Sequence, residues 1–239
     1  MSALSLFYAG ISYAGAVVFF GGLAYKLIGY ALTPSPLKIP LTPQPASAAG
    51  VAWKAVGSIL SFRALWNGDR WTWVGGYGLH LVLVFVFIRH LRLFLSPVPW
   101  PLADVQPFAL LIGALLPLPL VYLMARRAAV DRYRQISSGA DYFALALLLL
   151  IGLSGLSLKF LFHADVVGIK EFLLGLMLLS PVEVPEHPAF LVHFSLVLVL
   201  GFYFPFSKLI HAGGVLLSPT TMQADDAPDV RHVNPWGGQ

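Results

Sequence analysis

The sequence predicts an all-α integral membrane protein, a bundle of five transmembrane helices. Of its 239 residues, 58% are hydrophobic and only 11% are charged, against about 25% charged residues in an ordinary soluble domain. A soluble globular enzyme needs more charged side chains than this to cover its surface. A chain with so many apolar residues is also not intrinsically disordered. The chain has no cysteine, which excludes disulfides, cysteine-ligated iron–sulfur clusters and covalently attached c-type haem.

A transmembrane helix needs about 20 mostly apolar residues to cross the hydrocarbon layer. Two such segments lie in the first half of the chain, from about Ser5 to Leu32 and from about Trp73 to Leu95. A cleaved signal peptide is the alternative interpretation of the first segment. That segment has no basic start, and its apolar run is too long for a typical signal peptide. We therefore expect it to be retained as a helix.

Three further segments complete the predicted bundle, from about Pro107 to Ala125, Tyr142 to Phe162 and Pro188 to Leu216. They are too long and too uniformly apolar for the short alternating strands of an outer-membrane barrel. The predicted membrane domain therefore covers residues 1–218, and residues 219–239 form a C-terminal tail.

Three stretches between these segments are predicted not to span the membrane. Thr33–Ala46 is rich in proline and is expected to be extended. Ser47–Leu65 has the pattern of a short helix lying on the membrane surface. Val166–Ser180 is apolar but too short to cross, so we expect a helix at the interface.

The basic residues predict the orientation of the bundle. Most of the 15 lysines and arginines lie on one side, between the first and second segments, between the third and fourth, and after the fifth. The positive-inside rule places that side in the cytoplasm, with the N-terminus outside and the C-terminus cytoplasmic. Because topology accounts for the basic residues, the net charge of +4 does not indicate binding to nucleic acid.

Four of the seven histidines lie within two apolar segments or at their ends. Continuous helices would separate His80 from His90 by about 15 Å along the axis, and His193 from His211 by about 27 Å. Antiparallel packing pairs His80 with His211 and His90 with His193. The two separations match only if tilt or a kink at Pro205 shortens the longer one.

An ionisable side chain inside a membrane is costly, so it usually has a partner. Paired imidazoles on facing helices are the usual way to hold haem by two axial ligands, and a neutral imidazole lowers the cost of burial. The pattern favours two haem b groups over hydrogen-bonded structural histidines, a metal site or a proton path, which stay open as alternatives. Lys159 and His163, at the end of the fourth segment, are weaker candidates for contact with a quinone, since interfacial residues look the same.

The histidine spacing, ten residues on the second segment and eighteen on the fifth, resembles that of the gamma (cytochrome b) subunit of respiratory nitrate reductases. Local sequence narrows the resemblance. The stretch from Ser138 to Gly155 resembles the fourth helix of DsrM, the family of haem b membrane subunits in the complex associated with dissimilatory sulfite reductase. Tyr203–His211, Leu217–Thr220 and Arg231–Trp236 resemble its C-terminal end, and the nitrate reductase subunit lacks that tail.

The resemblance implies that the four histidines ligate two haems, with His80 and His211 on the cytoplasmic side and His90 and His193 on the outer side. It implies an electron-transfer subunit of an oxidoreductase complex, a multi-pass protein of the bacterial cytoplasmic (inner) membrane. Electrons would pass between the quinone pool and a cytoplasmic iron–sulfur subunit related to heterodisulfide reductase, in sulfite reduction or sulfur oxidation. Further implied partners are a periplasmic multihaem cytochrome c, a periplasmic iron–sulfur subunit and a second quinone-interacting membrane subunit.

The chain departs from the nitrate reductase pattern at one place. That subunit uses a lysine near the outer start of its third helix for quinol, whereas the stretch Pro101–Pro107 has none. Two other functions stay open, the gamma subunit of a nitrate reductase itself and a proton-coupled transporter that uses the same histidines as proton relays. Transporters often contain internal repeats, and we find no repeat in this chain.

Overall fold

The structure is a computed structural model that describes residues 1–33, 40, 42–218 and 222–226. Within these ranges every regular element is helical. Five spans are long and apolar enough to cross a membrane, namely Ala3–Leu32, Arg70–Leu91, Trp100–Ala129, Gly139–Phe160 and Pro188–Phe206. The predicted all-α bundle of five membrane-crossing helices is confirmed, and the chain is a multi-pass membrane protein. The orientation of its termini stays a prediction.

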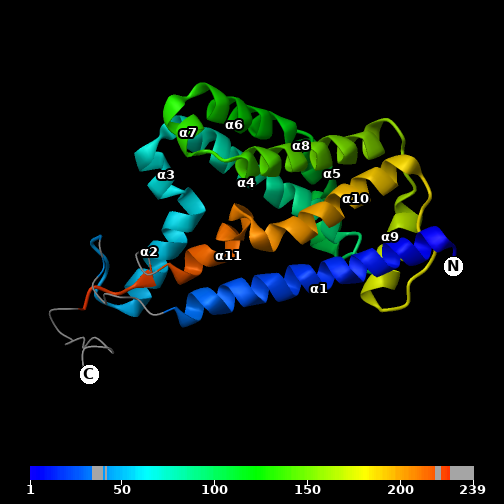
Figure 1. The fold of residues 1–239 in the computed structure, drawn as a ribbon, viewed down its shortest axis with the longest axis horizontal. Helices are drawn as coiled ribbons and strands as arrows, with labels where there is room; N and C mark the ends of the chain where they lie inside the picture. Colours follow the sequence, from blue (N-terminus) through cyan, green and yellow to red (C-terminus); the bar gives the residue numbers. More distant parts are fainter. Residues whose placement is uncertain (34–39, 41, 219–221, 227–239) are drawn as a thin grey trace.

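Long helices run side by side along the molecule (Figure 1). Helix α1 (Ala3–Leu32) packs along α10 (Pro188–Tyr203), which packs in turn on α8 (Gly139–Phe160). Helix α4 (Arg70–Leu91) and α8 are joined through α6 (Pro117–Ala129), which contacts both. The histidine-bearing helices α4 and α10 thus belong to one bundle.

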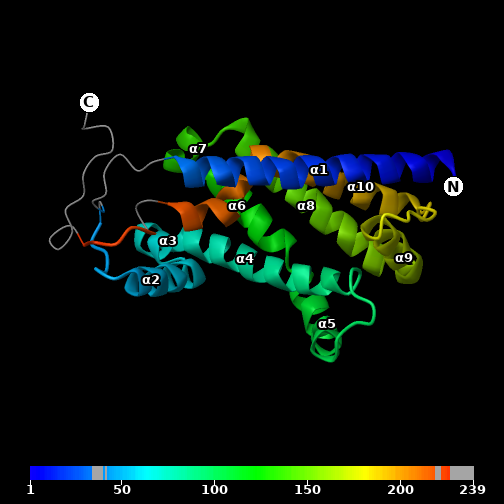
Figure 2. The same ribbon diagram turned by 90° about the horizontal axis from the view of Figure 1, so that it is seen from below.

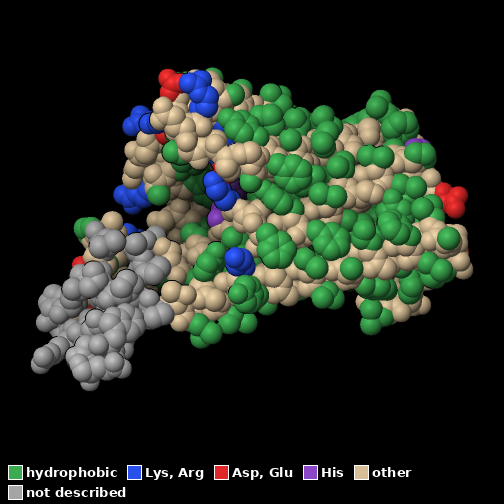
Figure 3. All heavy atoms as spheres, viewed as in Figure 1, with side chains coloured by type: hydrophobic (Ala, Val, Ile, Leu, Met, Phe, Trp, Pro, Cys, Tyr) green, Lys and Arg blue, Asp and Glu red, His purple; other side chains and the backbone are tan. Residues whose placement is uncertain are grey.

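The bundle has two distinct ends. The chain starts at the end that carries α9 (Val166–Met177), which we call the α9 end, and α7 (Asp131–Ile136) lies at the opposite α7 end (Figure 1). Lysine and arginine side chains gather towards the α7 end, whereas apolar side chains cover much of the remaining length (Figure 3). An apolar belt with a basic end is the charge distribution of a protein oriented by the positive-inside rule.

Two clusters of buried side chains form the core. The cluster at the α9 end consists of Tyr8, Ile169, Phe172, Val184 and Phe190. The second joins α4, α6 and α8 and consists of Leu79, Val82, Leu116, Leu120 and Leu145. Lipid tails are as apolar as these side chains, so the hydrophobic effect contributes little to contacts between the helices. Close packing of the buried side chains stabilises these contacts instead.

The third span differs from its predicted form, because it begins earlier and is broken. Helix α5 (Trp100–Gly113) packs against α4, and a turn at residues 114–116 separates it from α6. Figure 2 shows α5 leaving the direction of the other spans. Pro117 and Pro119 lack the backbone N–H that would continue the hydrogen-bond ladder of α5, so the chain restarts as α6.

The fifth segment is likewise not the single helix predicted from Pro188 to Leu216. Helix α10 ends at Tyr203 and is followed by two 3₁₀ turns, Phe204–Phe206 and Lys208–Ile210, and by the short helix α11 (His211–Gly214). A last 3₁₀ turn covers Val215–Leu217. Pro205 interrupts the helix because it has no N–H to donate. The separation of about 27 Å between His193 and His211 assumed one continuous helix. That assumption was wrong.

The stretches predicted not to span the membrane are mostly helical. Ser47–Leu65 forms α2 (Ala48–Ser61) and the start of α3 (Arg63–Gly68), with a break at Phe62, whose φ is 51°. The helix expected within Val166–Ser180 is α9, and its place at the membrane interface stays a prediction. Half of the proline-rich Thr33–Ala46 and most of the tail 219–239, with Arg231–Trp236, lie outside the described residues. The described residues 40 and 42–46 form no helix or strand.

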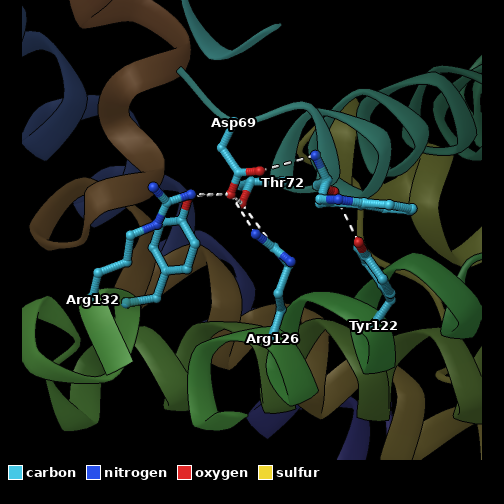
Figure 4. Close-up of polar contacts among 7 residues, drawn as sticks. Asp69, Thr72, Tyr122, Arg126 and Arg132 are labelled. Carbon is cyan, nitrogen blue, oxygen red and sulfur yellow. Dashed lines mark hydrogen bonds and ion pairs between the residues drawn. The ribbon is translucent and has the colours of Figure 1, made fainter. Parts of the chain in front are cut away.

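A polar cluster at the α7 end fixes the start of α4 (Figure 4). Asp69 caps the helix by accepting a hydrogen bond from the backbone N–H of Trp71 (3.0 Å). Its carboxylate also accepts hydrogen bonds from Tyr133, Thr72, Arg126 and Arg132. These bonds, that of Tyr133 first, hold the pKa of Asp69 well below its ordinary value. The cluster therefore ties α4, which carries His80 and His90, to α6 and α7.

Glycine allows a close approach between α4 and α6. A Cβ atom on Gly75 would lie 2.6 Å from Cδ1 of Tyr122, closer than carbon atoms pack. The Tyr122 hydroxyl donates a hydrogen bond to the carbonyl of Trp71 (2.9 Å) across this contact (Figure 4). Small residues at such crossings are typical of membrane helix pairs.

Candidate functional site

The structure brings the four membrane histidines together as two pairs of rings. The ring centroids of His80 and His211 lie 5.8 Å apart, and those of His90 and His193 lie 6.5 Å apart. His80 and His90 project from α4, His193 from α10 and His211 from α11. These are the same two pairs that the sequence analysis expected.

Each of the four rings is oriented through its Nδ1 atom. In His80, His90 and His211, Nδ1 lies 2.7, 2.7 and 2.8 Å from the backbone carbonyl oxygens of Gly76, Val86 and Lys208. A carbonyl oxygen only accepts, so Nδ1 carries the proton. In each neutral ring, Nε2 then carries the lone pair and is the atom that can bind a metal.

His193 is oriented by a side chain instead of the backbone. Its Nδ1 lies 2.9 Å from Oγ of Ser154 on α8, and the Ser154 hydroxyl donates to the carbonyl of Ile151 (3.0 Å). The serine oxygen therefore accepts the proton of Nδ1, which leaves Nε2 as the lone-pair nitrogen here too. Gly155 makes room for this ring, because a Cβ there would lie only 3.1 Å from Cε1 of His193.

The donor sets fit haem iron better than a bare metal ion. Two imidazoles that bind one iron from opposite sides have ring centroids about 6 Å apart, since each metal–nitrogen bond is about 2 Å long. Both observed separations are close to this value. In the part of the chain that the structure describes, there is no group of three His, Cys, Asp or Glu side chains able to hold a metal ion. Two nitrogens per site match the axial ligands of a haem, whose ring supplies the other four.

His211 depends on contacts from α8, because it follows the broken end of α10. Lys208, whose carbonyl orients His211, forms an ion pair with Asp141 at 2.8 Å. The Asp141 side chain is 5% exposed and also accepts hydrogen bonds from the N–H and hydroxyl of Ser138. The Tyr203 hydroxyl donates to the carbonyl of Ala140 (3.0 Å). The two DsrM-like stretches that contain these residues thus meet in space beside His211.

An aromatic side chain covers His80 from outside the spans. Phe62 occupies the left-handed break between α2 and α3, and its ring lies 4.8 Å from that of His80 and 5.6 Å from that of Tyr77. Phe62, at the break between α2 and α3, therefore covers one side of the His80 ring.

An open, mainly apolar pocket of about 430 Å³ lies towards the α9 end, and its wall includes Ser154, which contacts His193. Its walls come from the end of α8 and the start of α10: Ser154, Ser157, Phe162, His187, Pro188, Ala189 and Val192. The two expected quinone residues are not in this lining. Lys159 lies in the last turn of α8, and His163 follows it with a φ of 48°.

Several residues of this site were not found by sequence reasoning. Ser154, Asp141 and Lys208 act through contacts between helices, which no spacing along the chain reveals. His187 lies in a position that looks like an ordinary loop, and Phe62 lies within the predicted surface helix Ser47–Leu65, where nothing in the sequence marks a contact with His80. The carbonyl partners of His80 and His90 could have been predicted from the sequence, because every helical histidine has a carbonyl four residues before it.

Fold and site together define the class of the protein, a membrane-embedded helical bundle with two pairs of facing imidazoles, which is typical of membrane cytochromes b. No protein-family model matches the chain. The chain is 35% identical over 271 aligned residues to the Hdr-like menaquinol oxidoreductase cytochrome b-like subunit of Archaeoglobus fulgidus, a match that covers 95% of the chain and 82% of that protein. It is 30% identical to the protein of the same name from Archaeoglobus profundus, over 98% of the chain and 83% of the relative. The chain belongs to this family of cytochrome b-like subunits.

Proposed function

We propose that the protein is a di-haem cytochrome b that transfers electrons between membrane quinone and a cytoplasmic iron–sulfur subunit. The observation that carries this proposal is the two imidazole pairs with ring separations of 5.8 and 6.5 Å, in which every Nδ1 is already hydrogen-bonded. The names of the two relatives, which include menaquinol and cytochrome b, support it. Haem iron, when bound, supplies one-electron redox chemistry.

In this proposal the chain positions its redox groups and controls their surroundings. His80 and His211 hold one haem and His90 and His193 the other, each ring kept in the same tautomer by its Nδ1 hydrogen bond. Such hydrogen bonds raise the basicity of the ligand and so lower the reduction potential of the bound iron. The rings of His80 and His193 are partly buried between the helices, whereas those of His90 and His211 are exposed.

The proposed setting is an Hdr-like complex, because both relatives carry that name. We infer a cytoplasmic iron–sulfur partner related to heterodisulfide reductase at the basic α7 end. Periplasmic multihaem cytochrome c and iron–sulfur subunits, and a second quinone-interacting membrane subunit, complete the proposed assembly. Assignment to the DsrM branch and to dissimilatory sulfur metabolism rests on the stretches around Asp141 and His211. Both relatives are archaeal, so the proposed location is the cell membrane without restriction to bacteria.

A haem count tests the proposal. In the purified detergent-solubilised protein, a pyridine haemochrome assay is expected to give two haem b per chain. The variants His80→Ala, His90→Ala, His193→Ala and His211→Ala are each expected to retain one, since one axial ligand of one pair is lost. His163→Ala is the matched control and is expected to retain both. A folded protein without haem would refute the proposal.

A further inference from the structure

The two histidine pairs differ in how their rings face each other. The ring planes of His80 and His211 cross at 76°. Those of His90 and His193 lie at only 21° to each other. We propose that Phe62 is a positioning residue that holds the His80 ring across the His211 ring and thereby makes the two haems electronically different. This inference rests on the proposed di-haem function and goes beyond it, because it assigns a residue that sets the ligand orientation at one haem.

The angle between two axial imidazoles affects the electrons of the iron that they bind. The plane of each ring contains its iron–nitrogen bond, and the π orbital of that nitrogen overlaps one of two iron d orbitals. Parallel rings act on the same d orbital and separate the two in energy, whereas crossed rings act on both and leave them nearly equal. A low-spin ferric haem with crossed ligands therefore gives a much more anisotropic electron paramagnetic resonance (EPR) signal than one with parallel ligands.

Phe62 meets the His80 ring from outside the helix that carries it. The two rings lie 4.8 Å apart with their planes at 76°, an edge-to-face arrangement that aromatic rings favour. The hydrogen bond from Nδ1 of His80 to the carbonyl of Gly76 (2.7 Å) restrains the imidazole at one atom. A single hydrogen bond still allows the ring to tilt, and the contact with Phe62 blocks that tilt on one side.

The backbone of Phe62 indicates that its ring is needed. Its φ of 51° lies in the left-handed region, where a Cβ atom is unfavourable and glycine is the preferred residue at a helix end. Phe62 nevertheless ends α2, where its N–H donates to the carbonyl of Ser58, and its own carbonyl accepts from Leu65 and Trp66 at the start of α3. Strained residues of this kind persist where their surroundings hold them, and they gather at functional sites. Capping alone would be served better by glycine.

Other aromatic side chains hold Phe62 in place. Tyr77 lies edge-on to Phe62 at 5.6 Å, and Trp73 stacks on Tyr77 at 4.8 Å with 11° between their planes. The indole N–H of Trp73 also donates to the carbonyl of Ser61 (2.9 Å), the residue before Phe62. Trp73, Tyr77 and His80 are four and three residues apart on α4, so they share one face of that helix. These contacts therefore tie the break between α2 and α3 to the helix face that carries His80.

EPR of the oxidised, detergent-purified full chain tests the role of Phe62. We expect two low-spin signals from the wild type, one of them much more anisotropic. Phe62→Gly removes the ring at a position where glycine caps well. We expect it to lower the largest g value of the more anisotropic signal towards that of the other, which stays unchanged. Phe62→Tyr keeps an aromatic ring and is expected to retain the wild-type spectrum. Phe87→Ala is the matched control and is also expected to retain it, because Phe87 is on α4 but 67% exposed on the outside of the bundle.

A second variant keeps the test valid if Phe62→Gly does not fold. Trp73→Phe removes the N–H that holds the carbonyl of Ser61 but keeps a ring beside Tyr77, and it is expected to shift the same signal in the same direction by less. An unchanged spectrum in a Phe62→Gly protein with two haems would overturn the positioning role, as would equal shifts of both signals. Either result would leave the di-haem function standing. A wild-type protein without haem would instead remove the function on which the inference rests.

Discussion

The two histidine pairs occupy the same bundle but are supported in different ways. His90 and His193 both lie on uninterrupted helices, α4 and α10, and the ring of His193 rests against α8 at Gly155 and Ser154. His211 instead follows two 3₁₀ turns after the break at Pro205. Its backbone is held by the ion pair between Lys208 and Asp141.

This difference shows that both a regular helix and a series of 3₁₀ turns can bring a histidine ring close to its partner ring. Where both ligands are on straight helices, close packing of small residues sets the ring position. Where the helix is broken, polar contacts have to replace the lost helical hydrogen bonds, because unsatisfied backbone groups are costly in a membrane. We therefore expect the His90–His193 pair to be sensitive to added volume and the His80–His211 pair to be sensitive to lost charge.

The largest expected effect is on the His90–His193 pair. Gly155→Val adds a branched side chain whose Cβ alone would lie 3.1 Å from Cε1 of His193. Overpacking of this kind costs about 1–3 kcal/mol and shifts the side chains it meets. We expect the haemochrome count to fall from two towards one. Gly201→Val is the control, because no atom lies within 4 Å of its added Cβ. Equal haem contents in the two variants would show that the ring of His193 is not held by close packing.

A smaller effect is expected at the His80–His211 pair. Asp141→Ala removes the partner of Lys208 and the capping box at the start of α8. We expect the thermal unfolding midpoint in detergent to fall, by the equivalent of about 1–3 kcal/mol for a lost buried hydrogen-bond partner. The reduction potential of only one haem should also shift, as followed by redox titration of the visible spectrum. Asp131→Ala is the control, because Asp131 and Arg134 form an exposed pair of a kind that contributes less than about 1 kcal/mol. A shift of both potentials by Asp141→Ala would contradict separate support of the two pairs.

The smallest expected effect concerns the α9 end and its dependence on pH. Hydrogen bonds from the hydroxyls of Ser5 and Ser2 lower the pKa of Glu183 from 4.5 to about 2. A carboxyl group whose pKa is lowered by folding stabilises the protein above its unfolded pKa and loses that contribution as the pH falls towards its folded pKa. The unfolding midpoint of Glu183→Gln should therefore be slightly below that of the wild type at pH 6, and the difference should shrink between pH 4.5 and pH 2. A difference that grows on acidification would contradict the assigned bonds.

Much of the fold could be predicted because hydropathy over 20 residues depends only on composition. The five spans have this origin. The helices Ala48–Ser61 and Val166–Met177 were expected from shorter apolar patterns, and their place at the membrane surface stays a prediction. The breaks were predicted less well. A proline is visible in the sequence, but whether the chain kinks, restarts as a new helix or forms 3₁₀ turns depends on the partners that its freed carbonyls meet.

The sequence by itself determined the fold class, the five membrane-crossing segments and the four histidines within them, since each follows from the cost of placing polar groups in lipid. The sequence also predicted which histidines pair, but only the tertiary structure decided that the paired rings lie 5.8 and 6.5 Å apart despite unequal spacing along the chain. The tertiary structure also decided that Ser154 orients His193 and that Asp141 holds Lys208. Helical periodicity sets directions within one helix, whereas the distance between two helices depends on how all of them pack.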